Sequence, residues 1–193
     1  MMDDKTYIKL KALWKGHVYQ VWPNLKVETI SAHIDVFKNM DVVDIGCNAG
    51  ILTYNLAQYA NSYLGVERDK VAYKQALVTQ KFISTPGQFY NLSISDFISK
   101  VPGGYNAAFA SSVLYYFSES ALALMKKIML PKCKVVLFVS RENKPKYVKK
   151  TWLQKHNNLY HWRNIVAFLE SAKMHVEVRD EITNWVSVIG RQA

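Results

Sequence analysis

The sequence is poor in cysteine and in long apolar runs. Only Cys47 and Cys133 are present among 193 residues, so neither a disulfide framework nor a cysteine-based zinc site can be assembled. The longest aliphatic run, residues 135–139, is far shorter than the roughly 20 residues that cross a bilayer. No apolar stretch follows the acidic N-terminus, which argues against a signal peptide. We therefore expect a globular, cytoplasmic protein without a membrane partner.

Acidic residues are also scarce: 15 stand against 25 basic ones, a net charge of +10 that favours an anionic partner. Residues 141–163 carry seven basic side chains and one acidic one, interleaved with tyrosine and tryptophan. This mixture suits a phosphate backbone with stacked bases. It predicts a contact with RNA through Arg141, Lys146, Lys149, Lys150 and Trp152. The alternative is an ordinary solvated segment whose aromatic side chains face the core.

The chain contains no internal repeat and no Gly/Ser linker, so we predict a single domain over residues 1–193. After residue 40, short apolar runs alternate with helical patterns, which indicates a mostly parallel sheet covered on both faces. Helices are expected at 51–59, 69–82, 118–129 and 162–172, and the last two strands should form an antiparallel hairpin. The other strands are expected at 42–45, 62–66, 88–92, 107–111 and 134–139, and the hairpin strands at 176–179 and 185–189.

The first 38 residues fit this pattern less well and are interpreted as a helical leader. Helical spacing of Tyr7, Leu10 and Trp14 predicts one helix, and another is expected over 29–37. The leader either packs on an edge of the sheet or serves as a lid over a ligand, the lid side chains being Tyr19, Gln20 and Trp22. The rest divides into a cofactor-binding core (39–140), a basic insertion on the substrate side (141–163) and a closing helix with two strands (164–193).

The most informative segment is VVDIGCNAG, residues 42–50. A buried strand runs into Asp44, a turn containing Gly46 and Gly50 follows, and a helix begins. The two glycines let a ligand approach the backbone closely. Glu67 stands 21 residues after Gly46, at the end of the second strand, where a carboxylate is expected to accept hydrogen bonds from ribose hydroxyls.

The loop does not match a dinucleotide site. Its spacing is Gly-x-x-x-Gly, with Asn48 in between, whereas a dinucleotide fold requires Gly-x-Gly-x-x-Gly. Asp44 would also repel a pyrophosphate but suits a ligand with a cationic end. A cationic amino acid joined to a ribose and a base describes S-adenosylmethionine (SAM). Another kind of nucleotide-binding α/β domain is the alternative.

These residues resemble the first two motifs of class I SAM-dependent methyltransferases. The resemblance continues in Ser95-Asp96-Phe97, where that family places an acidic residue on the adenine amino group and an apolar neighbour against its ring. It extends to SSVLYYF, residues 111–117, where the fourth strand opens onto the reaction centre. The family's usual glycine is replaced by Asn48.

The resemblance implies an α/β fold with a seven-stranded, mostly parallel, doubly wound sheet, an antiparallel C-terminal strand and SAM as cofactor. It implies a reaction centre shaped by Ser112, Tyr115 and Tyr116. It also implies a cofactor site formed by Asp44, Gly46, Cys47, Asn48, Gly50, Glu67, Arg68, Asp96, Phe97 and Ser111. Cys47 is interpreted as a small spacer in the loop, not as a nucleophile.

The methyl acceptor is indicated mainly by motifs that are missing. The Asn/Asp-Pro-Pro-Tyr/Phe motif for exocyclic amino groups of DNA bases is absent, as are the Pro-Cys pair for cytosine and an acid after the fourth strand. No His/Asp/Glu cluster has metal-ligand spacing, so no metal is expected. His17, His156 and His161 are candidate bases with structural roles as the alternative. We expect methyl transfer to RNA; a small-molecule acceptor is the alternative, and a non-catalytic binding protein is a second one.

Overall fold

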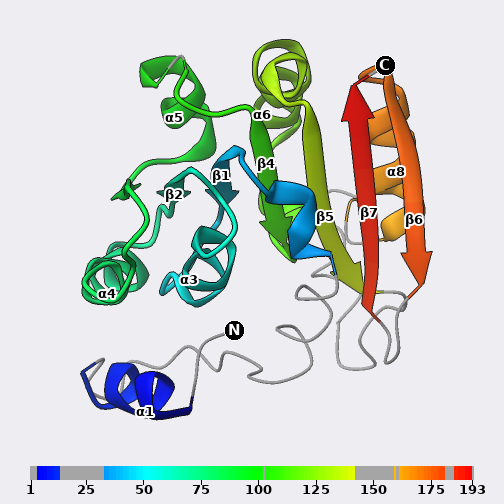
Figure 1. The fold of residues 1–193 in the computed structure, drawn as a ribbon. Coiled ribbons are helices and arrows are strands. Elements are labelled where there is room, and N and C mark those ends of the chain that lie inside the picture. Colours follow the sequence, from blue (N-terminus) through cyan, green and yellow to red (C-terminus); the bar gives the residue numbers. More distant parts are fainter. Residues whose placement is uncertain are drawn as a thin grey trace.

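The computed structural model describes residues 4–13, 33–101, 103–141, 159, 161–180 and 185–192. Its centre is a seven-stranded sheet in the order β3-β2-β1-β4-β5-β7-β6 (Figure 1). Strand β7 runs antiparallel to both of its neighbours, and the other six strands are parallel to one another. The strands are β1 (Asp41–Ile45), β2 (Ser62–Val66), β3 (Gly87–Tyr90), β4 (Ala107–Ser111), β5 (Val135–Arg141), β6 (Met174–Asp180) and β7 (Trp185–Gln192). This arrangement confirms the predicted fold class.

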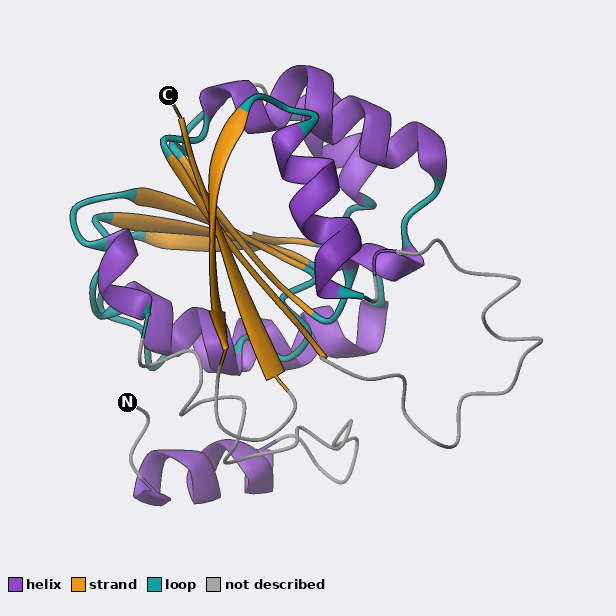
Figure 2. Cartoon of the chain, turned by 90° about the vertical axis from the view of Figure 1, so that its right-hand side faces the viewer, coloured by secondary structure: helices purple, strands orange, loops and turns teal. Residues whose placement is uncertain are grey.

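Helices cover both faces of the sheet (Figure 2). One face carries the 3₁₀ turn η1 (Ile34–Phe37), α3 (Ile51–Ala57) and α4 (Lys70–Gln80). The other carries α5 (Ile94–Lys100), α6 (Glu119–Leu124) and α8 (Trp162–Glu170). Strand residues alternate between these faces: Val42 and Phe109 pack beneath η1 and α3, whereas Val43 packs on the opposite side. Burial on both sides explains why the strands appear in the sequence as continuous apolar runs.

The helical prediction for residues 118–129 is only partly right. Helix α6 passes into a π-helical turn, η3 (Met125–Met129), and then into a 3₁₀ turn, η4 (Leu130–Lys132), which contains Pro131. The loop after β4 holds another 3₁₀ turn, η2 (Leu114–Tyr116). The widened and tightened turns accommodate a proline whose ring and missing N–H prevent the α-helix from continuing.

Three further differences between prediction and structure concern helices. Helix α3 stops at Ala57, so Tyr59 lies beyond it with 42% of its surface exposed and does not share the buried helix face. Helix α5 was not predicted; it begins where the Ser93 hydroxyl accepts a hydrogen bond from the N–H of Asp96. Of the helix expected at 29–37, the structure describes only η1, because residues 29–32 lie outside the described part.

The N-terminal helix α1 (Asp4–Leu13) contacts α4 and lies outside the helix layers that cover the sheet (Figures 1 and 2). The lid side chains expected at Tyr19, Gln20 and Trp22 lie outside the described residues. None of the helices that the structure describes is long and apolar enough to cross a membrane.

The topology sets the position of the site. After β1 the chain moves outward through β2 and β3 and then returns to place β4 on the other side of β1. Open α/β sheets bind ligands at the carboxyl ends of strands where the order reverses in this way. The glycine loop follows β1 at that edge, and Ser111 ends β4 beside it.

Candidate functional site

The loop between β1 and α3 turns through three residues with positive φ. Gly46 has φ +68°, Asn48 +51° and Gly50 +77°. Asparagine tolerates this left-handed conformation better than most residues, so it can stand where the family usually has glycine. At Gly46 space is restricted too, because a Cβ atom there would lie 2.5 Å from Cγ2 of Val113. The loop is therefore in close contact with the segment that follows β4.

The same loop uses all five backbone N–H groups of residues 46–50 within the chain. The first two donate to the carbonyl oxygen of Val66, at 2.8 and 3.1 Å. The third donates to Glu67 Oε2 at 3.0 Å, the fourth to Oδ1 of Asn48 at 2.7 Å and the fifth to the carbonyl of Cys47 at 2.9 Å. Phosphate-binding loops present such N–H groups to their ligand. This loop is not built to bind phosphate.

Glu67 is held in place at the carboxyl end of β2. Besides the contact with Asn48, its Oε1 accepts a hydrogen bond from the N–H of Asp69 at 2.8 Å. The side-chain amide of Asn91 donates to the carbonyl oxygens of Glu67 and Arg68, at 2.9 and 3.0 Å. Each carboxylate oxygen has two lone pairs, so Glu67 keeps accepting capacity for hydroxyl donors.

Asp44, in β1, is buried beneath α3. Thr53 donates a hydrogen bond to Asp44 Oδ2 at 2.5 Å. Burial, opposed by the hydrogen bond from Thr53 and assisted by the nearby charge of Glu67, raises the pKa of Asp44 to about 7. Sequence reasoning identified Asp44 but missed Thr53. The only available signal was that Thr53 lies in the first turn of the helix that follows the loop.

The Cys47 thiol packs inside the protein next to Gly65 and Phe89. Burial raises the pKa of Cys47 well above its usual value, so the thiol stays protonated and is a poor nucleophile. Across the loop, the Thr79 hydroxyl of α4 donates to the carbonyl of Ala49 at 2.6 Å. Cys47 is thus a buried residue of the loop, and its spacer role stays a prediction. Sequence reasoning missed Thr79.

Hydroxyl and aromatic side chains stand at the end of β4 and in the segment that follows it. The hydroxyls of Ser111 and Ser112 are buried, and neither has a hydrogen-bond partner among the described residues. Ser112 adopts a φ of +54°, and its N–H donates to the carbonyl of Val139 at 2.9 Å. Tyr115 and Tyr116 follow in η2 with their ring centroids 4.4 Å apart, and Tyr116 is 45% exposed. Strained residues and unsatisfied buried polar atoms are often found at functional sites.

The two side chains predicted to contact adenine point in different directions. Asp96 is on the exposed surface of α5, where it accepts a hydrogen bond from Ser93 at 2.6 Å and pairs with Lys100 at 3.4 Å. Phe97 is fully buried between the rings of Tyr90 and Tyr105. A ring without exposed surface cannot cover an adenine, so Phe97 is a core residue here. The helix that sequence reasoning missed, α5, is what turns these side chains in opposite directions.

Most of the basic insertion lies outside the described residues, including Lys146, Lys149, Lys150 and Trp152, and so do His17 and His156. The backbone of Arg141 ends β5. At the other end of the insertion, His161 precedes α8, and the guanidinium of Arg163 lies 5.0 Å from the ring centroid of Trp162. No group of three or more His, Cys, Asp or Glu in the described ranges is arranged to hold a metal ion.

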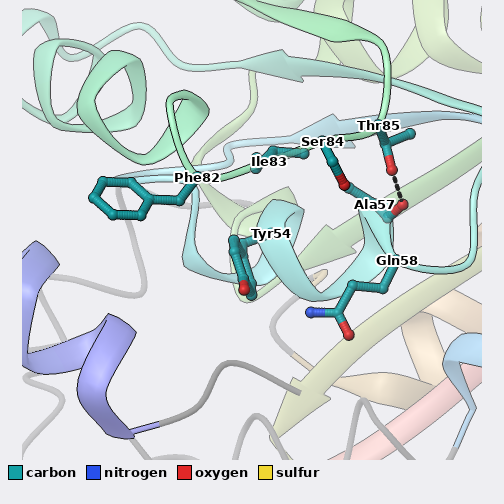
Figure 3. Close-up of a pocket in the computed structure, with 7 residues that line it drawn as sticks. All are labelled: Tyr54, Ala57, Gln58, Phe82, Ile83, Ser84 and Thr85. Carbon is teal, nitrogen blue, oxygen red and sulfur yellow. Dashed lines mark hydrogen bonds between the residues drawn. The ribbon is translucent and has the colours of Figure 1, made fainter.

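A surface depression of about 230 Å³ lies at the far end of α3 from the glycine loop (Figure 3). Tyr54 and Gln58 of the α3 region face Phe82 and Thr85 across it, and the Thr85 hydroxyl donates to the carbonyl of Ala57. Because it contains none of the residues gathered at the carboxyl edge, it is separate from the candidate site.

No protein-family model and no curated protein matches the chain. Solved structures match it by fold. A SAM-dependent methyltransferase from Archaeoglobus fulgidus is 13% identical over 87% of this chain and 93% of its own, with a TM-score of 0.68. Magnesium protoporphyrin IX methyltransferase from Synechocystis PCC 6803, solved with bound SAM, is 15% identical over 100% and 99%, with a TM-score of 0.64. The methyltransferase domain of the bacterial protein CtHen1 is 19% identical over 86% and 97%, with a TM-score of 0.63.

The chain has the class I methyltransferase fold. Within this fold, the structure brings together the glycine loop, Asp44, Glu67 and Ser111–Ser112 at the carboxyl edge where strand order reverses. Phe97 is fully buried there and leaves no ring face for a ligand. The neighbours share the fold at low sequence identity, so the chemistry of this site rests on its own residues.

Proposed function

We propose that this protein is a SAM-dependent methyltransferase. The observation that carries the proposal is the chemistry of the loop: its N–H groups are all used internally, Glu67 bonds to it, and Asp44 lies in the strand that leads into it. Such a site repels phosphate and accepts hydroxyl donors and positive charge. SAM carries a cationic amino acid and a ribose with two hydroxyls, so its chemistry fits this set of acceptors. The Synechocystis neighbour was solved with SAM and also with SAH, S-adenosylhomocysteine.

The roles of the residues follow from their positions. Glu67 would accept hydrogen bonds from the ribose hydroxyls, and ionised Asp44 would favour the cationic end of the ligand. The backbone of residues 46–50 allows close approach because two of its positions are glycines. Bound SAM supplies a methyl group on a sulfonium, which needs little electrophilic help. The chain's part would be to orient the acceptor atom and exclude water, and we assign this role to Ser112, Tyr115 and Tyr116.

The experiment that tests this proposal is calorimetric titration of the protein with S-adenosylhomocysteine, followed by transfer of a tritiated methyl group to fractionated cell extract. Binding with transfer to a fraction supports the proposal. Absence of binding would refute it. Binding without transfer to RNA, protein or metabolite fractions would favour the non-catalytic alternative.

For the acceptor we propose RNA, supported by the +6 net charge of residues 141–163. Each neutralised phosphate of a single strand contributes about −0.7 to the slope of log affinity against log salt. Changing Lys146, Lys149 and Lys150 to Gln should therefore flatten the slope by about 2 if each lysine contacts a phosphate.

A matched control uses three exposed lysines of the helical segment that leads into β5: Lys126, Lys127 and Lys132. The variant with these three lysines changed to Gln loses the same charge. Its slope of log affinity against log salt should equal that of wild type. Equal slopes for both triple variants would favour a small-molecule acceptor instead.

A further inference from the structure

Two groups of aromatic side chains lie at the carboxyl edge of neighbouring strands. Tyr115 and Tyr116 follow β4 directly in η2. Helix α8 leads back to the start of β6, which runs parallel to β5, so the first residues of α8, Trp162 and Arg163, lie at the same edge. Strands β4 and β5 are hydrogen-bonded to each other.

Both groups also belong to the same face of the sheet. Leu114 of η2 and Ile165 of α8 are buried in one apolar cluster, and Trp162 packs against that cluster. The aromatic residues therefore flank the ends of β4 and β5 on the side covered by α5, α6 and α8.

The exposure of these side chains is typical of a contact surface. Tyr116 is 45% exposed although most large apolar side chains of the sheet and its helices are buried. Arg163 is exposed, and its guanidinium lies 5.0 Å from the Trp162 ring centroid. Aromatic faces beside an arginine are what bind the bases and phosphates of a single-stranded nucleic acid.

Two hydroxyl groups stand at the end of β4, shortly before the tyrosines of η2 in the sequence. The buried hydroxyls of Ser111 and Ser112 have no hydrogen-bond partner among the described residues. The next residue, Val113, touches the loop at Gly46. The end of β4 is therefore next to the glycine loop through Val113 and leads directly into η2.

From this arrangement we infer that the acceptor site takes a single unpaired nucleobase of an RNA strand. Tyr116 provides the stacking face, Arg163, held over the Trp162 ring, attracts a neighbouring phosphate, and Ser112 offers its hydroxyl to the edge of the base. This inference rests on the proposed function and deepens it. A paired base has no free face to offer, so a single strand should be preferred to a duplex.

The test compares three labelled probes by fluorescence anisotropy: a short single-stranded RNA, the same strand annealed to its complement, and an abasic strand of equal length. Wild type should bind the single strand about tenfold or more tightly than either other probe. Tyr116→Ala should lose about tenfold in affinity for the single strand at every salt concentration, and nothing for the abasic strand. Arg163→Gln should weaken binding of the single-stranded RNA and of the abasic strand alike. It should also reduce the slope of log affinity against log salt by about 0.7.

Matched controls come from the opposite edge of the sheet. Tyr59 is 42% exposed near the end of α3, and Arg191 is exposed opposite Val135 at the start of β5. Tyr59→Ala and Arg191→Gln should bind all three probes like wild type. Because Trp162 is half-buried beneath the Arg163 guanidinium, Trp162→Leu keeps its apolar packing while removing the ring that holds Arg163, and it should resemble Arg163→Gln.

The outcomes separate this inference from the proposed function. Equal affinities of Tyr116→Ala and Tyr59→Ala for the single strand would overturn it, as would equal binding of the single-stranded and abasic probes by wild type. If either result occurs while S-adenosylhomocysteine still binds, the methyltransferase proposal stands and the nucleobase site falls. If S-adenosylhomocysteine does not bind, both fall together.

Discussion

Asp44→Asn should make the protein more stable at pH 8 while weakening its affinity for the cofactor. The Asp44 carboxyl is buried, and its pKa is raised to about 7, against 3.8 in ordinary surroundings. The folded protein therefore keeps a proton that the unfolded chain releases near pH 4. The contribution of Asp44 to the free energy of unfolding is therefore fully present below about pH 4, and it is lost as the pH rises toward 7. Asparagine is neutral throughout and still offers an oxygen to Thr53.

The magnitude follows from the two pKa values. Their separation corresponds to about 4 kcal/mol at about 1.4 kcal/mol per pH unit. We expect Asp44→Asn to gain about 2–4 kcal/mol relative to wild type between pH 5 and pH 8, or about 5–15 °C in melting temperature for a chain of this length. Wild-type affinity for S-adenosylhomocysteine should rise over the same range as Asp44 ionises, and the affinity of the variant should stay low and flat.

The measurement is urea denaturation and calorimetric titration at four pH values from 5 to 8, for wild type and Asp44→Asn in parallel. Other titrating groups act on both proteins and cancel in the difference. Glu67→Gln serves as a control, because removing the neighbouring charge should lower the midpoint of the wild-type pH dependence. Stability curves that run parallel for wild type and Asp44→Asn would show that Asp44 does not hold a proton near neutral pH in the folded protein.

Three further substitutions probe the site. Glu67→Ala should weaken S-adenosylhomocysteine binding at least tenfold while the fold persists, since about 1.5–3 kcal/mol is lost per charge-assisted hydrogen bond; unchanged affinity by calorimetry would remove Glu67 from the site. Gly46→Ala should lower the free energy of unfolding, measured by urea denaturation, by about 2–4 kcal/mol, because residue 46 has a positive φ and an added Cβ would lie 2.5 Å from Val113. Adding Val113→Ala should restore only the part of this loss that comes from the steric contact. Complete restoration would contradict the contribution of the positive φ. Asp96→Asn should change cofactor affinity less than threefold (~0.6 kcal/mol), because Asp96 is exposed and paired with Lys100; a tenfold loss, or loss of discrimination against an analogue without the adenine amino group, would restore its adenine contact.

Much of the fold was predictable because its signals are local. Strands buried on both faces appear as apolar runs, and the strand at residues 107–111 was predicted at its observed bounds. The glycine loop and Glu67 were found because close approach requires glycine and because the end of the second strand comes at a regular distance in this fold. Helix α5 was missed because seven residues with a polar face leave little periodicity, and its segment was interpreted as a binding motif instead.

By itself, the sequence determined the alternation of strands and helices, the acceptor character of the loop region and the basic charge of residues 141–163. Only the tertiary structure decided which groups meet. The N–H groups of Gly46, Cys47 and Asn48 are satisfied by Val66 and Glu67, about twenty residues away. Asp44 meets Thr53 only after α3 folds back over β1. Phe97 is a core residue for the same reason. Hydrogen bonding and burial depend on partners distant in sequence, and their positions are set by how strands and helices pack.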